Sequence, residues 1–145
     1  MATEYPASSM SGEGLRFFAE TVAKESGGRL IAKPSFDAAA GVKSADMPAA
    51  IRDGRVTGGD AFAGGLGRLD AIFLLSSLPF VAATNSDARR LYEAARMAYA
   101  RRLAQEKLFL LFATAWPPTG VWARKPIIAP GDLQDLAIRA YDATG

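Results

Sequence analysis

The chain has 145 residues, of which 50% are apolar and 22% charged, and its 17 Lys and Arg nearly balance its 15 Asp and Glu. This length fits one ordinary domain, and this composition excludes a disordered tail, a collagen and a coiled-coil rod. With no Cys and no His, the chain cannot build a zinc finger, a thiol nucleophile or a triad with an imidazole base. A net charge of +2 is too small for a polyanion-binding surface, so we expect no nucleic-acid partner.

The first half of the sequence alternates helical and extended patterns. Apolar residues from Leu15 to Ala23 recur at helical spacing, and Gly27 and Gly28 can end that helix in the left-handed conformation. The expected elements are, in order, a helix from Ser11 to Gly27, a strand over residues 29–36, a helix capped by Ser44 and stopped at Gly54, a strand over residues 55–63, and a short helix with a turn between residues 70 and 83.

The second half continues the alternation. The run over residues 108–116 is continuously apolar, as expected of a strand covered on both faces of a sheet. The expected elements are a long helix capped within residues 85–87 with an apolar stripe to Leu103, the strand over residues 108–116, a turn over residues 117–120, a strand over residues 121–124, a helical turn at residues 131–135, and a strand over residues 136–141. We therefore predict one α/β domain over residues 1–145, with helices flanking a mixed, mostly parallel sheet.

Three features that could carry chemistry have simpler explanations. The glycines of residues 58–67 match neither the dinucleotide fingerprint nor the P-loop, so we interpret them as a turn with close backbone packing. Glu93 lies one helical turn from Arg89, which makes an ion pair a simpler interpretation of the arginine-rich helix than a nucleic-acid surface. An acid–base dyad needs two carboxylates close together, and the sequence spacing does not bring together any two of Glu13, Asp60, Asp70 and Asp142.

Arg139 needs an anion. It lies in the middle of an apolar strand pattern, where an unpaired guanidinium would be costly to desolvate. The pattern leaves two interpretations open. The first is a structural salt bridge or a strand with a wet second face, and the second is a carboxylate ligand bound by both arms of the guanidinium.

Two tryptophans flank the predicted turn over residues 117–120. Tryptophan usually fills a core, but aromatic side chains at strand ends also line ligand clefts in open α/β sheets. Trp116 and Trp122 are compatible with either role.

Five stretches of the sequence together carry a family resemblance. They are residues 1–9 (MATEYPASS), residues 18–29, residues 49–56 (AAIRDGRV), the tripeptide Leu78-Pro79-Phe80, and residues 126–139 (PIIAPGDLQDLAIR). In this order and spacing they resemble the first half of the TRAP transporter solute receptors of the DctP-like family. That resemblance implies the lobe of a two-lobed, type II periplasmic binding protein whose signal peptide has been removed.

The resemblance also implies a function. Such receptors deliver organic acids to the TRAP permease subunits in the membrane and are not enzymes, and no cofactor or metal is expected. The position of Arg139 matches the family arginine that binds the ligand carboxylate. Trp122 stands where a second family arginine is often found, so a less polar or aromatic acid is the expected ligand. The residues expected to line the cleft are Tyr5, Ser9, Phe62, Trp116 and Trp122.

Family members are longer than this chain, so the resemblance implies a truncated chain, a proteolytic fragment or a misassigned reading frame. Half of a two-lobed protein would expose apolar edges, and we expect homo-oligomers for that reason. Two alternatives remain open. One is a small histidine-independent enzyme acting on a carboxylic acid, and the other is a lobe that binds nothing alone because a cleft with one wall buries too little of a ligand.

Overall fold

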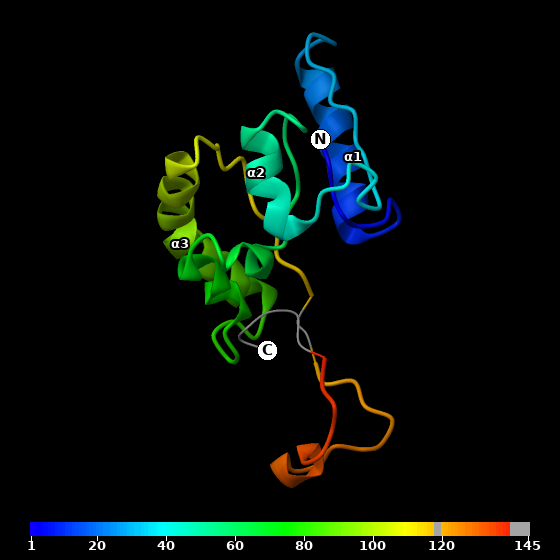
Figure 1. Ribbon diagram of the computed structural model, residues 1–145, viewed down its shortest axis with the longest axis vertical. Coiled ribbons are helices and arrows are strands. Elements are labelled where there is room, and N and C mark those ends of the chain that lie inside the picture. The colour runs from blue at the N-terminus through cyan, green and yellow to red at the C-terminus, as the bar shows by residue number, and fades with distance from the viewer. Residues whose placement is uncertain (118–119, 140–145) are drawn as a thin grey trace.

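The computed structural model describes residues 1–117 and 120–139, which contain three α-helices. They are α1 (Met10–Glu25), α2 (Met47–Arg52) and α3 (Asn85–Gln105), and Figure 1 shows α2 between the other two. The 3-10 helices are η1 (Ser44–Asp46), η2 (Ala63–Leu66), η3 (Ala71–Ser77) and η4 (Pro130–Leu133). Of the sequence predictions, Asp142, the middle of the turn over residues 117–120 and the end of the strand over residues 136–141 lie outside the described residues.

The predicted first helix is confirmed, with its start one residue earlier than expected. Ser9 is the N-cap of α1, and its Oγ accepts a hydrogen bond from the backbone N–H of Gly12 at 3.1 Å. After the helix, Gly27 and Gly28 both adopt positive φ angles, and the N–H of Gly28 bonds to the carbonyl of Ala23 at 2.8 Å. The glycine pair therefore ends α1 as the sequence predicts.

The second helix forms, but Ser44 does not cap it. The N-cap of η1 is Lys43 and that of α2 is Asp46, and neither side chain makes a capping hydrogen bond. The Ser44 side chain is buried and bonds to Glu4 and Phe62 instead. A serine before a helical pattern predicts an N-cap, but the Ser44 side chain is used in hydrogen bonds to residues distant in the sequence.

The long helix α3 is confirmed, and its cap lies one residue before the predicted segment. Thr84 and Asp87 form a reciprocal capping box, in which the Asp87 N–H donates to Thr84 Oγ1 at 3.1 Å and the Thr84 N–H donates to Asp87 Oδ2 at 3.1 Å. The predicted apolar stripe faces the core through Ala95, Tyr99 and Leu103.

The strand predictions are not confirmed as strands, because the described residues contain only isolated bridges. Ala2 pairs in parallel with Ser35 on one side and with Gly59 on the other. The backbone of Ala2 donates to Gly58 and accepts from Asp60, at 3.0 and 2.9 Å. Pro34 removes a donor from one neighbour, and Gly58-Gly59 weakens the other, so each segment pairs over only a few residues.

Residues 108–117 run beside these paired segments in an extended conformation. Leu111 lines the same hollow as Met1 and Gly58, while Trp116 contacts Tyr5 and Phe62, so this segment runs in the same direction as the two paired segments. Within the described part of the chain, no backbone hydrogen bond joins residues 109–117 to another segment. The predicted buried strand is therefore present as an extended segment without a sheet partner.

Two apolar clusters make up the core. One joins η2, η3 and α3 through Phe73, whose ring stacks on Tyr99 with centroids 5.3 Å apart. The other packs α2 against the paired segments, and Ala61 contacts both clusters. The buried members are Leu66, Phe73, Ala95, Tyr99 and Leu103 in the first cluster, and Ala2, Val42, Met47 and Ala50 in the second.

The packing interpretation of the glycine-rich stretch is confirmed at Gly59. A Cβ added there would come within 2.1 Å of the Met47 sulfur, so only glycine lets the backbone approach α2 so closely. The stretch then enters η2, whose first turn packs on η1.

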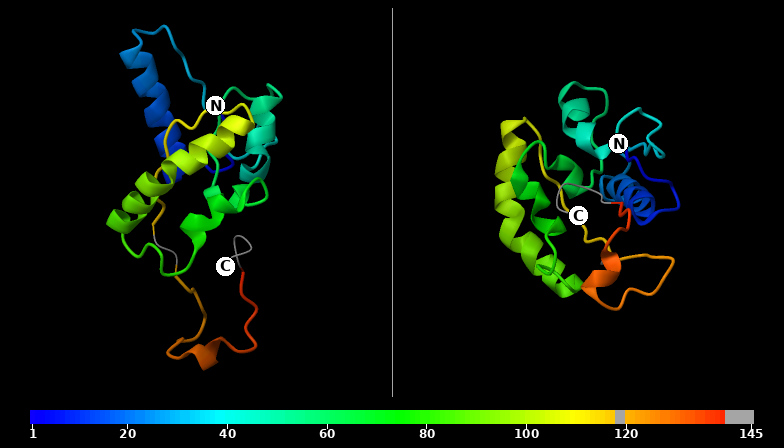
Figure 2. Two further views of the ribbon diagram at one scale, coloured as in Figure 1. Left: turned by 90° about the vertical axis from the view of Figure 1, so that its left-hand side faces the viewer. Right: turned by 60° about the horizontal axis from the view of Figure 1, so that its bottom comes forward.

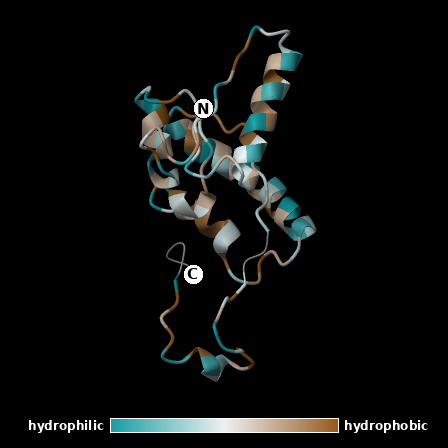
Figure 3. Cartoon of the chain, turned by 90° about the vertical axis from the view of Figure 1, so that its right-hand side faces the viewer, coloured by the Kyte–Doolittle hydropathy of each residue, from teal (hydrophilic) through white to brown (hydrophobic). Residues whose placement is uncertain are grey.

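The C-terminal part of the chain leaves the body of the molecule. Residues 120–139 form an extended arm that carries η4 and then turns back, as two views show (Figures 1 and 2). Hydrophobic residues lie in the extended segments as well as in the helices (Figure 3). None of the helices in the described ranges has the length and apolar character needed to cross a bilayer.

Candidate functional site

Three aromatic rings meet at one end of the paired segments. The Tyr5 ring meets Trp116 edge-on with centroids 4.9 Å apart, and the Phe62 ring lies 5.9 Å from Trp116. Tyr5 and Phe62 follow the paired segments 1–3 and 57–60, and Trp116 ends the extended segment over residues 108–117. We call these three side chains the aromatic cluster. They place an apolar wall at the carboxyl ends of parallel segments, where ligands bind in open α/β folds.

A polar network lies beside the aromatic cluster. Thr3 Oγ1 donates to Asp60 Oδ2 at 3.0 Å and accepts from the backbone N–H of Tyr5 at 3.2 Å. The Ser44 hydroxyl donates to Glu4 Oε1 and accepts from the backbone N–H of Phe62 at 2.9 Å. These contacts join residues far apart in the sequence, and they fix the backbone on both sides of the aromatic cluster.

Tyr5 is held in its neutral form. Burial raises the pKa of its hydroxyl, and the nearby Glu4 carboxylate raises that pKa further. The Tyr5 hydroxyl also interacts with the Glu4 and Ser44 side chains, so it belongs to the polar network that supports the aromatic cluster.

The other three predicted site residues are Ser9, Trp122 and Arg139. The Ser9 hydroxyl donates to the Pro6 carbonyl at 2.6 Å and caps α1, so it is already engaged in local structure. Trp122 is 95% exposed, against 42% for Trp116. Arg139 is exposed on the segment that follows η4 and leads back toward the body (Figure 1).

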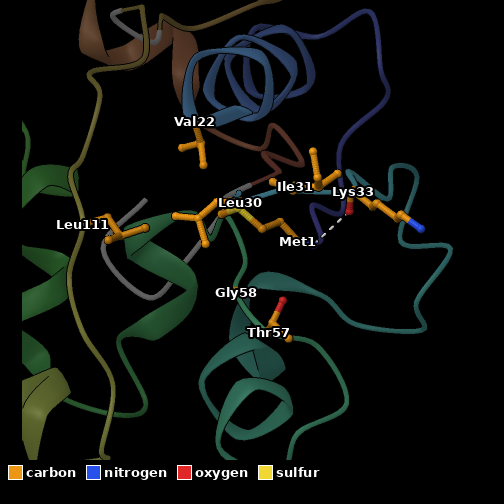
Figure 4. Close-up of a pocket in the computed structure, with 9 residues that line it drawn as sticks. Met1, Val22, Leu30, Ile31, Lys33, Thr57, Gly58 and Leu111 are labelled. Atoms are coloured by element: carbon orange, nitrogen blue, oxygen red, sulfur yellow. Dashed lines mark hydrogen bonds between the residues drawn. The ribbon is translucent and has the colours of Figure 1, made fainter. Parts of the chain in front are cut away.

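An apolar hollow lies at the opposite end of the paired segments. It holds about 570 Å³ and is lined mainly by apolar side chains, with Leu111 on one side and Leu30 and Ile31 on the other (Figure 4). Lys33 is exposed, and Figure 4 shows its side chain extending away from the hollow. Because none of the predicted site residues lines this hollow, it is a poor match for an acid-binding site.

Sequence reasoning did not find the two polar residues that support the aromatic cluster. Glu4 directly precedes the predicted site residue Tyr5, and only its position after the first extended segment could have indicated its role. Ser44 carried a signal for a helix cap instead. The sequence suggests Asp60 as a catalytic acid and as part of the loop over residues 60–62 that completes the cleft, and the structure gives it a hydrogen bond from Thr3.

A protein-family comparison decides the family of this chain. The model of the bacterial extracellular solute-binding proteins, family 7 (DctP), matches residues 1–144. The chain belongs to the DctP family. Its resemblance to the TRAP solute receptors is thereby confirmed.

Solved structures of extracytoplasmic receptors match this DctP chain. DctP7 of Bordetella pertussis, described as binding pyroglutamic acid, is 29% identical with a TM-score of 0.93 over 99% of this chain and 48% of its own. DctP6 of the same organism, also described as binding pyroglutamic acid, is 29% identical with a TM-score of 0.77, covering 81% of this chain and 38% of its own. A TRAP periplasmic solute-binding protein of Chromohalobacter salexigens with bound D-glucuronate is 25% identical with a TM-score of 0.67, covering 77% and 37%.

This DctP chain spans about half the length of the structures that it matches, as the 48% coverage of DctP7 shows. Its backbone nevertheless follows that receptor almost completely over its own length. A comparison with curated protein sequences found no match.

Proposed function

We propose that this chain forms one lobe of an extracytoplasmic TRAP solute receptor that binds a small organic acid through Arg139. The observation that carries the proposal is the aromatic cluster at the carboxyl ends of parallel segments, in a chain that follows DctP7 over 99% of its length. All three matched receptors are described with an organic acid, either pyroglutamic acid or D-glucuronate.

The chemistry of such a ligand suits the residues present. A carboxylate needs a cationic or donor-rich partner, and the planar guanidinium of Arg139 offers two parallel N–H donors to it. The aromatic cluster then supplies apolar contact for the rest of the ligand. Trp122 and Ser9, which lies at the start of α1, complete the proposed lining.

The proposal extends to the fold and the working partners. The two parallel bridges at Ala2 and the extended segment over residues 108–117 support a mostly parallel sheet in the complete receptor. We propose that the receptor works in the periplasm and delivers its acid to the TRAP permease subunits, which its membership of an extracellular solute-binding family supports. We propose binding without chemical conversion of the ligand, as in the solute-binding family to which the chain belongs.

Calorimetric titration tests this function. A receptor carrying both lobes would be titrated with pyroglutamate, glucuronate and a panel of aromatic acids, alongside its Arg139→Ala variant. We expect at least one acid to bind the parent protein and to bind Arg139→Ala about 30-fold more weakly or worse, because truncating one partner of a charged pair costs about 2–5 kcal/mol. Equal binding by both proteins would remove Arg139 from the site.

A further inference from the structure

Ser44 occupies a buried position between three segments of the chain. It is only 4% exposed, and both its backbone and its side chain bond to the carboxylate of Glu4. Its backbone N–H donates to Glu4 Oε1 at 3.1 Å, and its hydroxyl donates to the same oxygen. The Ser44 hydroxyl also accepts from the backbone N–H of Phe62 at 2.9 Å.

The directions of these hydrogen bonds are fixed by chemistry. A serine hydroxyl has one proton, and an ionised carboxylate can only accept, so the Ser44 proton must point to Glu4. A lone pair of the same oxygen then accepts from Phe62. One oxygen atom thus ties residue 4, which is 40 positions earlier, to residue 62, which is 18 positions later.

The two residues that bond to Ser44, Glu4 and Phe62, lie next to or in the aromatic cluster. Glu4 directly precedes Tyr5, and Phe62 is itself a member of the cluster. Trp116 touches both rings, but no backbone hydrogen bond in the described part of the chain holds its segment in place. Elsewhere the segment is held by side-chain packing, such as the contact of Phe112 with Phe18. At Trp116 itself the ring contacts are those with Tyr5 and Phe62, and the Ser44 contacts help to set where these two residues lie.

We propose that Ser44 is a positioning residue of the solute site, whose hydroxyl holds Tyr5 and Phe62 in the places from which they orient Trp116. This inference rests on the proposed function for its biological meaning, because it concerns the wall of that site. Pre-organised walls strengthen binding by reducing what must be ordered when the ligand arrives.

The test reads Trp116 directly and needs no solute. Trp122 is replaced by phenylalanine so that Trp116 is the one tryptophan left, and quenching of its fluorescence by acrylamide is measured in the 145-residue chain. In the Ser44→Ala variant we expect the quenching constant to rise toward twofold, since full release would take Trp116 from its 42% exposure to about the 95% of Trp122.

A matched serine serves as the control. Ser26 also accepts a backbone N–H, that of Leu30 at 3.0 Å, but it lies at the end of α1. Ser26→Ala should therefore remove a comparable hydrogen bond and leave the Trp116 quenching constant unchanged. A rise of the same size in Ser26→Ala, or no rise in Ser44→Ala, would overturn the proposal.

Variants of Glu4 keep the test decisive if Ser44→Ala does not fold. Glu4→Gln retains an oxygen that accepts both Ser44 bonds, so we expect quenching as in the parent protein. Glu4→Ala removes that acceptor and should raise quenching as Ser44→Ala does. If both Glu4 variants behave alike, the Ser44 contact does not position the cluster. The failure of this proposal would leave the Arg139 titration unaffected, because the two readouts share no step.

Discussion

The Tyr5 and Trp116 rings meet at 63° between their planes with centroids 4.9 Å apart, so the positive edge of one ring faces the π system of the other. Such pairs stabilise the folded state by more than the burial of their apolar area alone. In this chain the pair also joins the first segment to the segment over residues 108–117, where the described structure shows no backbone hydrogen bond to another segment from residue 109 on. The contact is therefore expected to matter for stability as well as for the site.

A double-mutant cycle in urea unfolding measures this contact. We expect Tyr5→Ala and Trp116→Ala to show a coupling free energy of about 0.5–1.5 kcal/mol, the usual worth of an aromatic pair. The matched cycle of Tyr5→Ala with Trp122→Ala should be additive to within about 0.5 kcal/mol, because Trp122 is 95% exposed. Additivity in the first cycle would show that the rings do not interact.

Individual residues differ in how far the sequence could place them. Tyr5, Phe62 and Trp116 were expected in one cleft, and the structure brings them together. That expectation came from strand ends and from the family resemblance. Ser44 could not be placed in the same way, because a buried contact between residues 40 positions apart leaves no local pattern.

At the scale of elements, α3 has the best-defined beginning. Thr84 Oγ1 donates to Asp87 Oδ2 at 2.7 Å, in addition to the two reciprocal backbone bonds of the capping box. Each bond satisfies a polar group that the helix end would otherwise leave without a partner.

We expect Thr84→Ala to lower the free energy of unfolding by about 1 kcal/mol, the usual cost of losing an N-cap. Ser86→Ala is the matched control. Ser86 is exposed and has no hydrogen bond through its side chain in the described structure, so its replacement should have little effect. Urea denaturation of both variants checks this prediction, and an equal loss in both would mean that Thr84 is not the cap.

Two elements are joined by an ion network around Glu106. This carboxylate accepts from Arg102 at 2.9 Å and from Arg52 at 2.8 Å, and so links the end of α3 to α2. The hydrogen bond from Arg102 is the main cause that lowers the pKa of Glu106, with the charges of Arg102 and Arg52 adding to it.

The lowered pKa makes this link sensitive to acid. The unfolded chain binds a proton to Glu106 at a higher pH than the folded chain does, so the stabilisation is complete above the ordinary glutamate pKa and is lost as pH falls through the lower pKa of the folded state. We expect the urea midpoint to drop between pH 7 and about pH 3.5, and to drop less in Glu106→Gln. Parallel curves for the two proteins would exclude Glu106 as a source of the acid sensitivity.

The sequence predicts best those elements whose formation depends on residues close together in the chain. Helices α1 and α3 carry their own periodicity, caps and glycine stops, and both formed as expected. Strands depend on partners, and the described segments find a neighbour only around Ala2. The apolar run over residues 108–116 correctly indicates an extended segment. A sequence pattern cannot show whether another part of the same chain packs on that segment.

At the scale of the whole molecule, the chain leaves many large apolar side chains on its surface. Phe109 is 85% exposed, and Leu111 and Phe112 beside it are also exposed. These side chains lie on an extended segment with unpaired backbone groups, which is the kind of edge that invites pairing with another chain.

We expect the isolated chain to self-associate through this segment, as light scattering at rising concentration would show. Leu111→Lys should reduce the fraction of chains that associate, because charges on an edge segment oppose strand pairing. Met97→Lys introduces the same charge at an exposed position of α3 and should change little. The mass of a single chain at every concentration would contradict the expectation.

The central claim is that an acid from solution meets the Arg139 guanidinium, and a cycle between protein and ligand tests it most directly. Calorimetry would compare the best-bound acid of the panel with its uncharged amide, using a two-lobed receptor and its Arg139→Ala variant. We predict that Arg139→Ala weakens binding of the acid about 30-fold or more and leaves binding of the amide nearly unchanged, because only the acid offers a carboxylate. Equal weakening of the acid and the amide would show that Arg139 acts on the fold of the receptor and not on the ligand carboxylate.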